Sequence, residues 1–316
     1  MKTAAFLSPG GDFTASVDLA RRADELGYDS VWVTHGGGRD SFLVLAAYGA
    51  VAPRVRLGVG VLPIYPRHPI ATAQAALTLS EQTGGRYLLG LGVSHRPSME
   101  QQLGLHLADP LGTMREYVEV LRGAFGDGAR FEGSHYRVQW SMAVPGRLPS
   151  PPIYLAALST RMLELAGEIA DGVVLWLCDP PYVRNVAVPA LERGRRRAGK
   201  DLSGFEIVAA VPLAVTDDPA KARDAFRAEL VRYLSLPFYR AMLEASGHGA
   251  SLKRVDAGGP ADDALLDALG GIGDRAKCRA YVEAYRGAGV TLPAIRPITF
   301  PDAPWYRRTL EETAGA

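Results

Sequence analysis

The stretch RLGVGVLPIYPRHPIATAQAALTLSEQTGGRYLLGLGVSH, residues 56–95, alternates strand, loop and helix patterns in the order of a parallel α/β unit. VRLGVGV (55–61) and YLLGLGV (87–93) are nearly continuous apolar runs of strand length, which is typical of buried parallel strands. Between them, Pro69 is well placed as the first residue of a helix that stops at Gly84-Gly85. Two parallel strands deliver the loops that follow them to one rim.

The same alternation extends in both directions along the chain. Further strands are expected at residues 3–7, 30–34, 152–156, 172–177, 206–215 and 291–297. Helices are expected between Thr14 and Gly27 and at residues 40–51, 113–125, 160–170, 219–234, 236–249, 261–269, 275–286 and 304–314. Connections this short imply right-handed βαβ units.

Eight such repeats predict a (β/α)₈ TIM barrel formed by one domain over residues 1–316. Two insertions are expected. The first, after strand four at about residues 126–150, contains a hairpin pattern over 131–140, and the second, after strand seven, covers about residues 235–273. Within the second, the glycine-rich segment from Gly247 to Gly273 is expected to be a mobile connection. A doubly wound open sheet is the alternative fold.

The composition narrows the classes of function. Basic residues (35) and acidic residues (34) nearly balance, and a net charge of +1 leaves no electrostatic footprint for nucleic acid or an anionic membrane. The N-terminal apolar run is too short for a secretory signal, and no segment reaches the roughly 20 apolar residues of a membrane span. Cys178 and Cys278 lack CxxC spacing and are interpreted as thiols in a reduced compartment. We expect a cytoplasmic protein with a small-molecule partner.

The carboxyl ends of barrel strands carry the site in this fold, so the residues delivered there indicate the chemistry. None of the five lysines falls at an expected strand end, which argues against Schiff-base chemistry. The six histidines form no HxH or HExxH pattern and there is no GxSxG elbow, so we expect no metal site and no serine hydrolase. We call the carboxyl end of the barrel its mouth. Because serines, histidines and aromatic residues line it, it is interpreted as a cofactor-binding site, or cofactor seat.

The motifs of the opening stretch carry a resemblance to a known family. GVGVLPIYPRHP (58–69), TGGR (83–86) and GLGVSH (90–95) resemble the bacterial-luciferase-like superfamily of TIM-barrel oxidoreductases, in particular its coenzyme F420-dependent members. The resemblance extends to ADELGYDSVWV, LSTRMLELAGEIADGVV and AVPLAVTDDP and covers the chain from about Thr3 to about Thr216. No single motif is diagnostic, but their order and spacing together are fairly specific.

The resemblance implies a seat for coenzyme F420, with FMN as the alternative cofactor. The residues it indicates for cofactor binding are Ser8, Thr34, Gly60, Val61, Gly92, Val93, Ser94, His95, Ala157, Leu158, Ser159, Thr160 and Arg161. It also implies a bulge with a non-proline cis peptide at Gly60-Val61, where the alternative is a plain trans strand end. Neither GLGVSH nor GVGVLP satisfies GxGxxG, so a Rossmann nucleotide site is not indicated.

Two of these segments admit a second interpretation. The turn from Gly92 to His95 suits the ribityl chain and phosphate of a flavin-like cofactor, or is a glycine turn with exposed polar neighbours. The helix opened by Ser159-Thr160 has no capping box, so its first N–H groups and Arg161 can hold a phosphate. Alternatively, Ser159 or Thr160 is an ordinary N-cap and Arg161 is solvated.

His35 directly follows the second strand and is the candidate catalytic residue. A group titrating near neutrality there could donate a proton as hydride arrives elsewhere on the substrate. Related enzymes with a catalytic histidine here have an aspartate-histidine pair, whereas this chain has Thr34-His35, and a loop histidine satisfied by backbone is the alternative. Tyr65 and Trp176 are candidate walls of the substrate pocket, or core residues.

Three hypotheses about function follow. The first is an F420-dependent oxidoreductase that transfers hydride between reduced deazaflavin and an activated C=C, C=N or C=O group. The second is an FMN-dependent luciferase-like monooxygenase, and the third is a non-catalytic flavin-binding relative. The resemblance further implies a homodimer.

Overall fold

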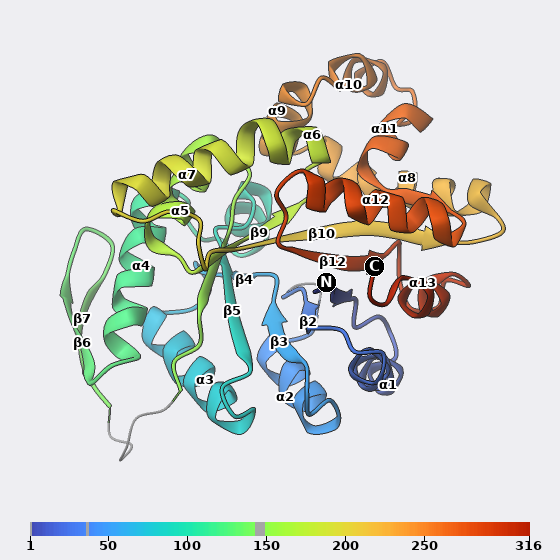
Figure 1. Cartoon of the computed structure of the whole chain (residues 1–316). Coiled ribbons are helices and arrows are strands. Elements are labelled where there is room, and N and C mark those ends of the chain that lie inside the picture. Colours follow the sequence, from blue (N-terminus) through green and yellow to red (C-terminus); the bar gives the residue numbers. More distant parts are fainter. Residues whose placement is uncertain (1, 36–37, 143–148) are drawn as a thin grey trace.

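Eight parallel strands close into a barrel in this computed structural model, which describes residues 2–35, 38–142 and 149–316 (Figure 1). The closing pairs are β10 with β9 and β12 with β1. The barrel strands are β1 (Ala4–Leu7), β2 (Ser30–Val33), β3 (Arg56–Val59), β5 (Tyr87–Gly92), β8 (Ile153–Ala156), β9 (Gly172–Trp176), β10 (Glu206–Val215) and β12 (Leu292–Pro297). The expected TIM barrel is thereby confirmed, and the open sheet is excluded.

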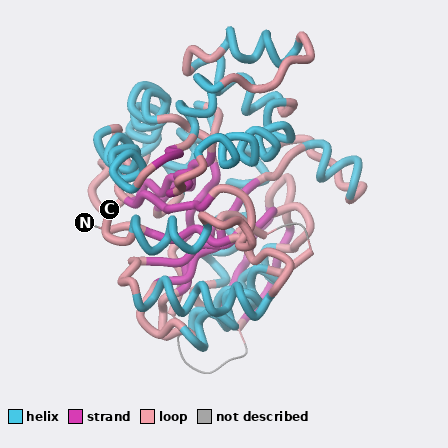
Figure 2. Tube along the Cα trace, turned by 90° about the vertical axis from the view of Figure 1, so that its right-hand side faces the viewer, coloured by secondary structure: helices cyan, strands magenta, loops and turns pink. Residues whose placement is uncertain are grey.

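The helices form a ring around these strands (Figure 2). Those that pack on the barrel are α1 (Phe13–Glu25), α2 (Ser41–Val51), α3 (Pro69–Gln82), α4 (Pro110–Ala124), α5 (Thr160–Ile169), α7 (Val188–Arg197), α12 (Arg275–Gly287) and α13 (Tyr306–Thr313). Most begin at an aspartate or serine whose side chain accepts a hydrogen bond from the first turn. Helix α1 begins at the N-cap Asp12 rather than at Thr14, because Asp12 accepts from Ala15 N.

The third expected strand is divided in two. It ends at Val59, and after a cis peptide bond between Gly60 and Val61 the chain pairs again as β4 (Leu62–Pro63). The expectation of a cis bond is confirmed. Glycine is required nearby because a Cβ on Gly90 would lie 2.0 Å from the Val59 carbonyl oxygen.

The two insertions fold into elements of their own. The first contains the hairpin of β6 (Gly128–Glu132) and β7 (Arg137–Ser141), whose turn is held by Glu116 through three backbone N–H groups. Helix α8 (Pro219–Leu234) leads into the second, which consists of α9 (Pro237–Ala245), α10 (Gly249–Asp256) and α11 (Asp263–Leu269) at the top of Figure 1 and ends at β11 (Gly271–Gly273). Helix α10 lies where the sequence indicated only a glycine-rich connection.

Short helices also follow β5 and β9. They are the π-helix η1 (Pro97–Gln102), α6 (Pro180–Tyr182) and the π-helix η2 (Val183–Ala187), which continues into α7. No helix in the described ranges is long and apolar enough to cross a membrane.

Buried side chains fill the barrel and the layer between barrel and helices. Inside the barrel, the rings of Trp32 and Tyr154 pack edge to face, with their centroids 5.4 Å apart. At the amino-terminal end of the strands, Arg56 pairs with Asp29 and Glu206, and Tyr154 donates to Glu206 at 2.9 Å. These charges close the bottom of the barrel, so a ligand has to enter from the opposite, carboxyl-terminal end.

Candidate functional site

The carboxyl ends of the strands concentrate unusual backbone geometry. Three non-glycine residues have a left-handed φ in the described part of the chain: Ser94 (61°), Leu177 (57°) and Thr299 (69°). Each follows a barrel strand within two residues, after β5, β9 and β12 respectively. Such conformations are costly and cluster at functional sites, so they mark this rim as the candidate site.

The expected cofactor-binding residues occupy one side of the rim. They follow β1, β2, β3/β4, β5 and β8, which are five consecutive strands in the barrel order. The strand register places Pro63 opposite Gly92, and Leu91 opposite Leu155. The structure therefore brings Gly60-Val61, the Gly92–His95 turn and the loop of Ala157 and Leu158 side by side.

Small residues form the floor of this side. A Cβ on Gly92 would lie 2.5 Å from Val61 Cγ2, so only glycine leaves the Val61 side chain in place; Ala156 Cβ, at 3.5 Å, would be in ordinary contact. Ser8 is anchored because its N–H donates to the Tyr306 hydroxyl at 2.8 Å. An uncharged floor of this kind leaves space for an apolar ring system.

The start of α5 is capped. Ser159 is the N-cap, and its Oγ accepts from Met162 N at 3.3 Å, as in the capping alternative. The N–H groups of Thr160 and Arg161 have no partner within the described ranges, so two donors at the positive end of the helix stay available to an anion. The Tyr182 hydroxyl donates to the Leu158 carbonyl at 2.6 Å and holds the loop before the helix.

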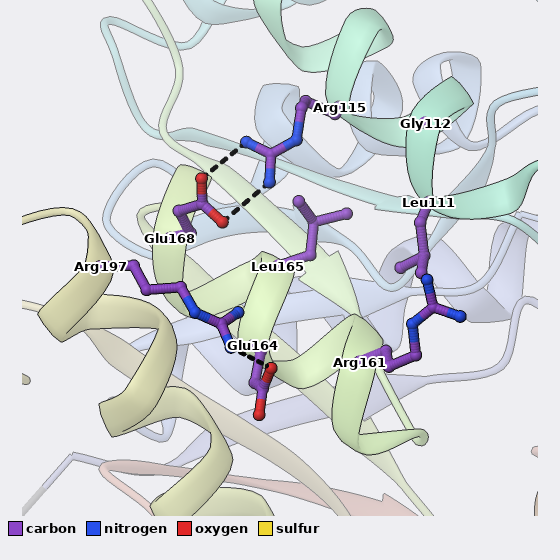
Figure 3. Close-up of a pocket in the computed structure, with 8 residues that line it drawn as sticks. All are labelled: Leu111, Gly112, Arg115, Arg161, Glu164, Leu165, Glu168 and Arg197. Carbon is purple, nitrogen blue, oxygen red and sulfur yellow. Dashed lines mark hydrogen bonds and ion pairs between the residues drawn. The ribbon is translucent and has the colours of Figure 1, made fainter.

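The Arg161 side chain lines a surface pocket of about 250 Å³ between α4, α5 and α7 (Figure 3). Both glutamates of this pocket are paired with other arginines: Glu168 accepts two hydrogen bonds from Arg115 at 2.8 Å, and Glu164 accepts one from Arg197 at 2.8 Å. Arg161 extends toward Leu111 and has no carboxylate partner among the residues described. It is therefore an exposed cation on the first turn of α5.

His35 is half-buried at the end of β2 and is held by the start of α2. Its Nδ1 lies 2.9 Å from Ser41 Oγ and accepts from Ser41 N at 3.2 Å. Burial lowers the pKa of His35; nearby Arg67 also lowers it, and Asp40 opposes them. Thr34, beside it, is exposed.

Aromatic side chains form the other side of the mouth. We define the aromatic wall as His95, Tyr239, Tyr233 and Trp176, whose successive ring centroids are 5.5, 5.0 and 5.7 Å apart. Burial lowers the pKa of His95. The wall joins the ends of β5 and β9 through Tyr233 of α8 and Tyr239 of α9, so these two helices pack against this side of the mouth.

A buried ion pair supports this wall. Arg296, at the end of β12, donates to Glu229 of α8 at 2.9 Å, and its guanidinium lies 4.9 Å from the Trp176 ring centre. Trp176 Nε1 and Tyr65 Oη are buried and have no hydrogen-bond partner among the residues that the structure describes, and burial raises the pKa of Tyr65. The sequence analysis named Trp176 and Tyr65, but it missed Glu229 and Tyr233 because a helical pattern does not say which turn reaches a barrel mouth.

Asp179 ties the second insertion to the barrel. Its carboxylate accepts from His248 Nε2 at 2.8 Å, Ser246 Oγ at 2.8 Å and Tyr182 N at 2.9 Å. Burial alone raises the pKa of Asp179, but these hydrogen bonds outweigh it and hold the pKa below the ordinary value. This contact, which we call the Asp179 latch, fixes the turn between α9 and α10.

The described residues offer neither a metal cluster nor an activated cysteine as a source of reactivity. They contain no group of three or more His, Cys, Asp or Glu that could hold a metal ion. Both cysteines are unpaired and buried, and burial raises the pKa of the Cys178 thiol, which disfavours the nucleophilic thiolate.

Comparison with known proteins gives consistent matches. The family described as luciferase-like monooxygenase matches residues 1–292. An uncharacterized protein of Mycobacterium tuberculosis is 33% identical over 281 residues, which cover 82% of each chain. A 5,10-methylenetetrahydromethanopterin reductase of Methanolobus tindarius is 29% identical over 293 residues, which cover 86% of each chain.

Solved structures share the fold over their whole length. The coenzyme F420-dependent tetrahydromethanopterin reductase of Methanopyrus kandleri has a TM-score of 0.80 at 22% identity and covers 99% of this chain and 97% of its own. An F420-dependent secondary alcohol dehydrogenase has a TM-score of 0.81 at 20% identity; the match covers 100% of this chain and 98% of the dehydrogenase. The oxygenating constituent of 3,6-diketocamphane monooxygenase from Pseudomonas putida, in complex with FMN, has a TM-score of 0.73 at 18% identity, covering 99% and 97%.

Proposed function

The chain belongs to the luciferase-like monooxygenase family, and from this premise we propose that it is an oxidoreductase dependent on coenzyme F420. The proposed reaction is hydride transfer between the reduced deazaflavin and an activated C=C, C=N or C=O group of a small organic substrate. A relative with 29% identity is named as a reductase, and two structural neighbours are named as F420-dependent.

The observation that carries this proposal is the division of the mouth into two sides. Five consecutive strands end in a floor that includes Gly92 and Ala156 and lead to two N–H groups at the start of α5 without a partner in the described part of the chain, with Arg161 on the same turn. This donor set fits a planar ring joined to a phosphate. The aromatic wall, which runs from His95 of that seat through Tyr239 and Tyr233 to Trp176, provides apolar surface that fits an organic substrate.

Each residue of the seat has a physical role in the proposal. Gly92 leaves room for the ring against Val61, while the N–H groups of Thr160 and Arg161 and the Arg161 guanidinium hold the phosphate. Ser94 and His95 offer hydrogen bonds to the polyol chain between ring and phosphate. The bound deazaflavin supplies the hydride chemistry, which the side chains of this mouth do not.

An FMN-dependent monooxygenase is the second candidate. It is favoured by the coverage of the mouth by α8 and α9, since oxygen chemistry needs a site closed to water, and by the FMN-containing structural neighbour. A non-catalytic flavin-binding protein is the third candidate, and steady-state turnover of any substrate would exclude it.

Anaerobic turnover tests the reaction class. Purified protein is mixed with reduced F420 and a panel of ketones, imines and conjugated enones, and the return of the oxidised deazaflavin absorbance is followed. We expect catalysed oxidation with at least one class. Turnover only with reduced FMN and oxygen would refute the proposal in favour of the monooxygenase.

The assembly and location remain proposals too. A homodimer is consistent with α2, which contains no charged residue and leaves Leu43 73% exposed. Cytoplasmic location agrees with two unpaired cysteines. One domain with insertions at about 126–150 and 235–273 is the proposed organisation.

A further inference from the structure

The hydrogen bonds of His35 determine which of its ring nitrogens can carry a proton. The backbone N–H of Ser41 points at His35 Nδ1 from 3.2 Å, and Ser41 Oγ lies 2.9 Å from the same atom. A backbone N–H can only donate, so Nδ1 has to accept with its lone pair. The ring proton of His35 is then on Nε2, which has no hydrogen-bond partner among the described residues.

The charges around His35 keep the ring neutral. Ser41 is the first residue of α2, so the positive end of the helix dipole faces the imidazole. The charged groups that face the ring are Asp40, the N-cap of α2, and Arg67 from the loop before α3, and these two pair with each other. Asp40 acts to raise the pKa of His35, but burial and Arg67, which pairs with Asp40, act against it, and the pKa lies below its ordinary value.

We propose that His35 acts as a neutral hydrogen-bond donor through Nε2–H to the substrate, instead of as an acid that gives up a proton. The inference rests on the function proposed above and assigns a different role from the proton donor expected from position alone. A neutral imidazole is too weak an acid to protonate a substrate near pH 7, but it stabilises negative charge that develops on an oxygen or nitrogen.

This role restricts the substrate class. The reacting group has to carry an acceptor atom beside the carbon that receives hydride, as in a ketone, aldehyde, imine or conjugated enone, so an isolated alkene is excluded. In carbonyl reduction, the hydride that reduced deazaflavin would supply, by breaking one of its C–H bonds, forms the new C–H bond at the carbonyl carbon; the π electrons move to oxygen, and Nε2–H stabilises that charge. Water then supplies the proton of the product hydroxyl.

The protonation state can be measured without cofactor or substrate. In protein labelled with ¹⁵N-histidine, with the His35 signals assigned by their loss in His35→Gln, we expect the neutral tautomer protonated at Nε2 at pH 7. His106, whose side chain is 83% exposed, provides an internal reference for titration. A proton on Nδ1 of His35, or an imidazolium at neutral pH, would overturn the inference whatever the outcome of the turnover assays.

A matched variant distinguishes the effect of the Ser41 hydroxyl on the His35 tautomer from the effect of the Ser41 backbone N–H. Ser41→Ala removes the hydroxyl and keeps the backbone N–H, so the Nε2–H tautomer should persist. A change to the Nδ1–H tautomer in this variant would overturn the argument, because the hydroxyl and not the helix N–H would then set the proton position.

Activity provides the second test. His35→Gln retains an uncharged N–H donor and should keep kcat within about tenfold of the native value, whereas His35→Ala should lose about 10²-fold, with cofactor affinity unchanged in both. The native kcat should not fall as pH rises from 6 to 8. Equal losses in the two variants, or a rate that falls through this range, would identify a proton donor and refute the inference.

Discussion

The Asp179 latch predicts a measurable coupling between one buried carboxylate and the cover of the mouth. The perturbation is Asp179→Asn, which keeps the side-chain volume but removes the charge that faces His248 Nε2, Ser246 Oγ and Tyr182 N. The Asp179 side chain is only 3% exposed, so water cannot replace these contacts. The variant should therefore loosen the turn between α9 and α10.

The magnitude follows from the three hydrogen bonds. Bonds to a charged acceptor contribute about 1.5–3 kcal/mol each and bonds to a neutral one about 0.5–1.5 kcal/mol, so the change costs about 1 kcal/mol for each bond. The sum is about 3 kcal/mol. For a chain of this size, Tm should fall by about 4–5 °C.

The pH dependence has a definite sign. Because the native pKa of Asp179 lies below its ordinary value, the latch contributes fully above pH about 4 and is lost as pH falls through the native pKa. The Tm difference between the native protein and Asp179→Asn should be constant above about pH 5 and shrink below about pH 4.

Calorimetry and hydrogen exchange are the assays. Exchange should accelerate over residues 237–256, which span α9 and α10, and KM for substrate should rise because Tyr239 of the aromatic wall is on α9. Asp302→Asn, at an exposed carboxylate, is the control. It should leave Tm, the exchange over residues 237–256 and KM unchanged. Equal Tm in the two variants, with unchanged exchange over 237–256, would refute the reasoning.

Three further substitutions test the seat and the base of the barrel. Arg161→Ala should weaken cofactor binding about tenfold, or about 1.4 kcal/mol, in an equilibrium titration, while Arg115→Ala, which removes an arginine already paired with Glu168, should not. Gly92→Ala places a Cβ 2.5 Å from Val61 Cγ2, so the folded state should lose about 1–3 kcal/mol of stability. Both Tm and cofactor affinity should fall, and an unchanged affinity would show that Gly92 is not part of the seat. Arg56→Ala should destabilise the fold by about 3–5 kcal/mol in denaturant unfolding yet leave cofactor affinity intact, since Arg56 closes the opposite end of the barrel, and a loss of affinity would contradict that separation.

The sequence predicted the barrel because its strands are continuous apolar runs and its helices have clear caps and glycine stops. It could not predict α10, because this short helix is stabilised by the packing of the insertion and by the latch at His248, which is 69 residues from Asp179. Helices η1 and η2 depart from α-helical hydrogen bonding and carry no pattern of their own.

The candidate site was predictable to a different degree on its two sides. Gly60-Val61 and Gly92 belong to local motifs, so strand position alone placed them at the rim. The pairing of Arg296 with Glu229 depends on how α8 crosses the mouth, which no local pattern specifies. The role of His35 depends on the direction of one backbone N–H at Ser41, and this is visible only in three dimensions.

Cofactor identity is the most direct test of the central claim. Purified protein is titrated in parallel with F420, FMN and FAD, following fluorescence, with Arg161→Ala titrated alongside as a matched variant. The account predicts that F420 binds at least tenfold more tightly than FMN, a difference of about 1.4 kcal/mol, and that the variant weakens F420 binding. FMN binding at least as tight as that of F420 would contradict it.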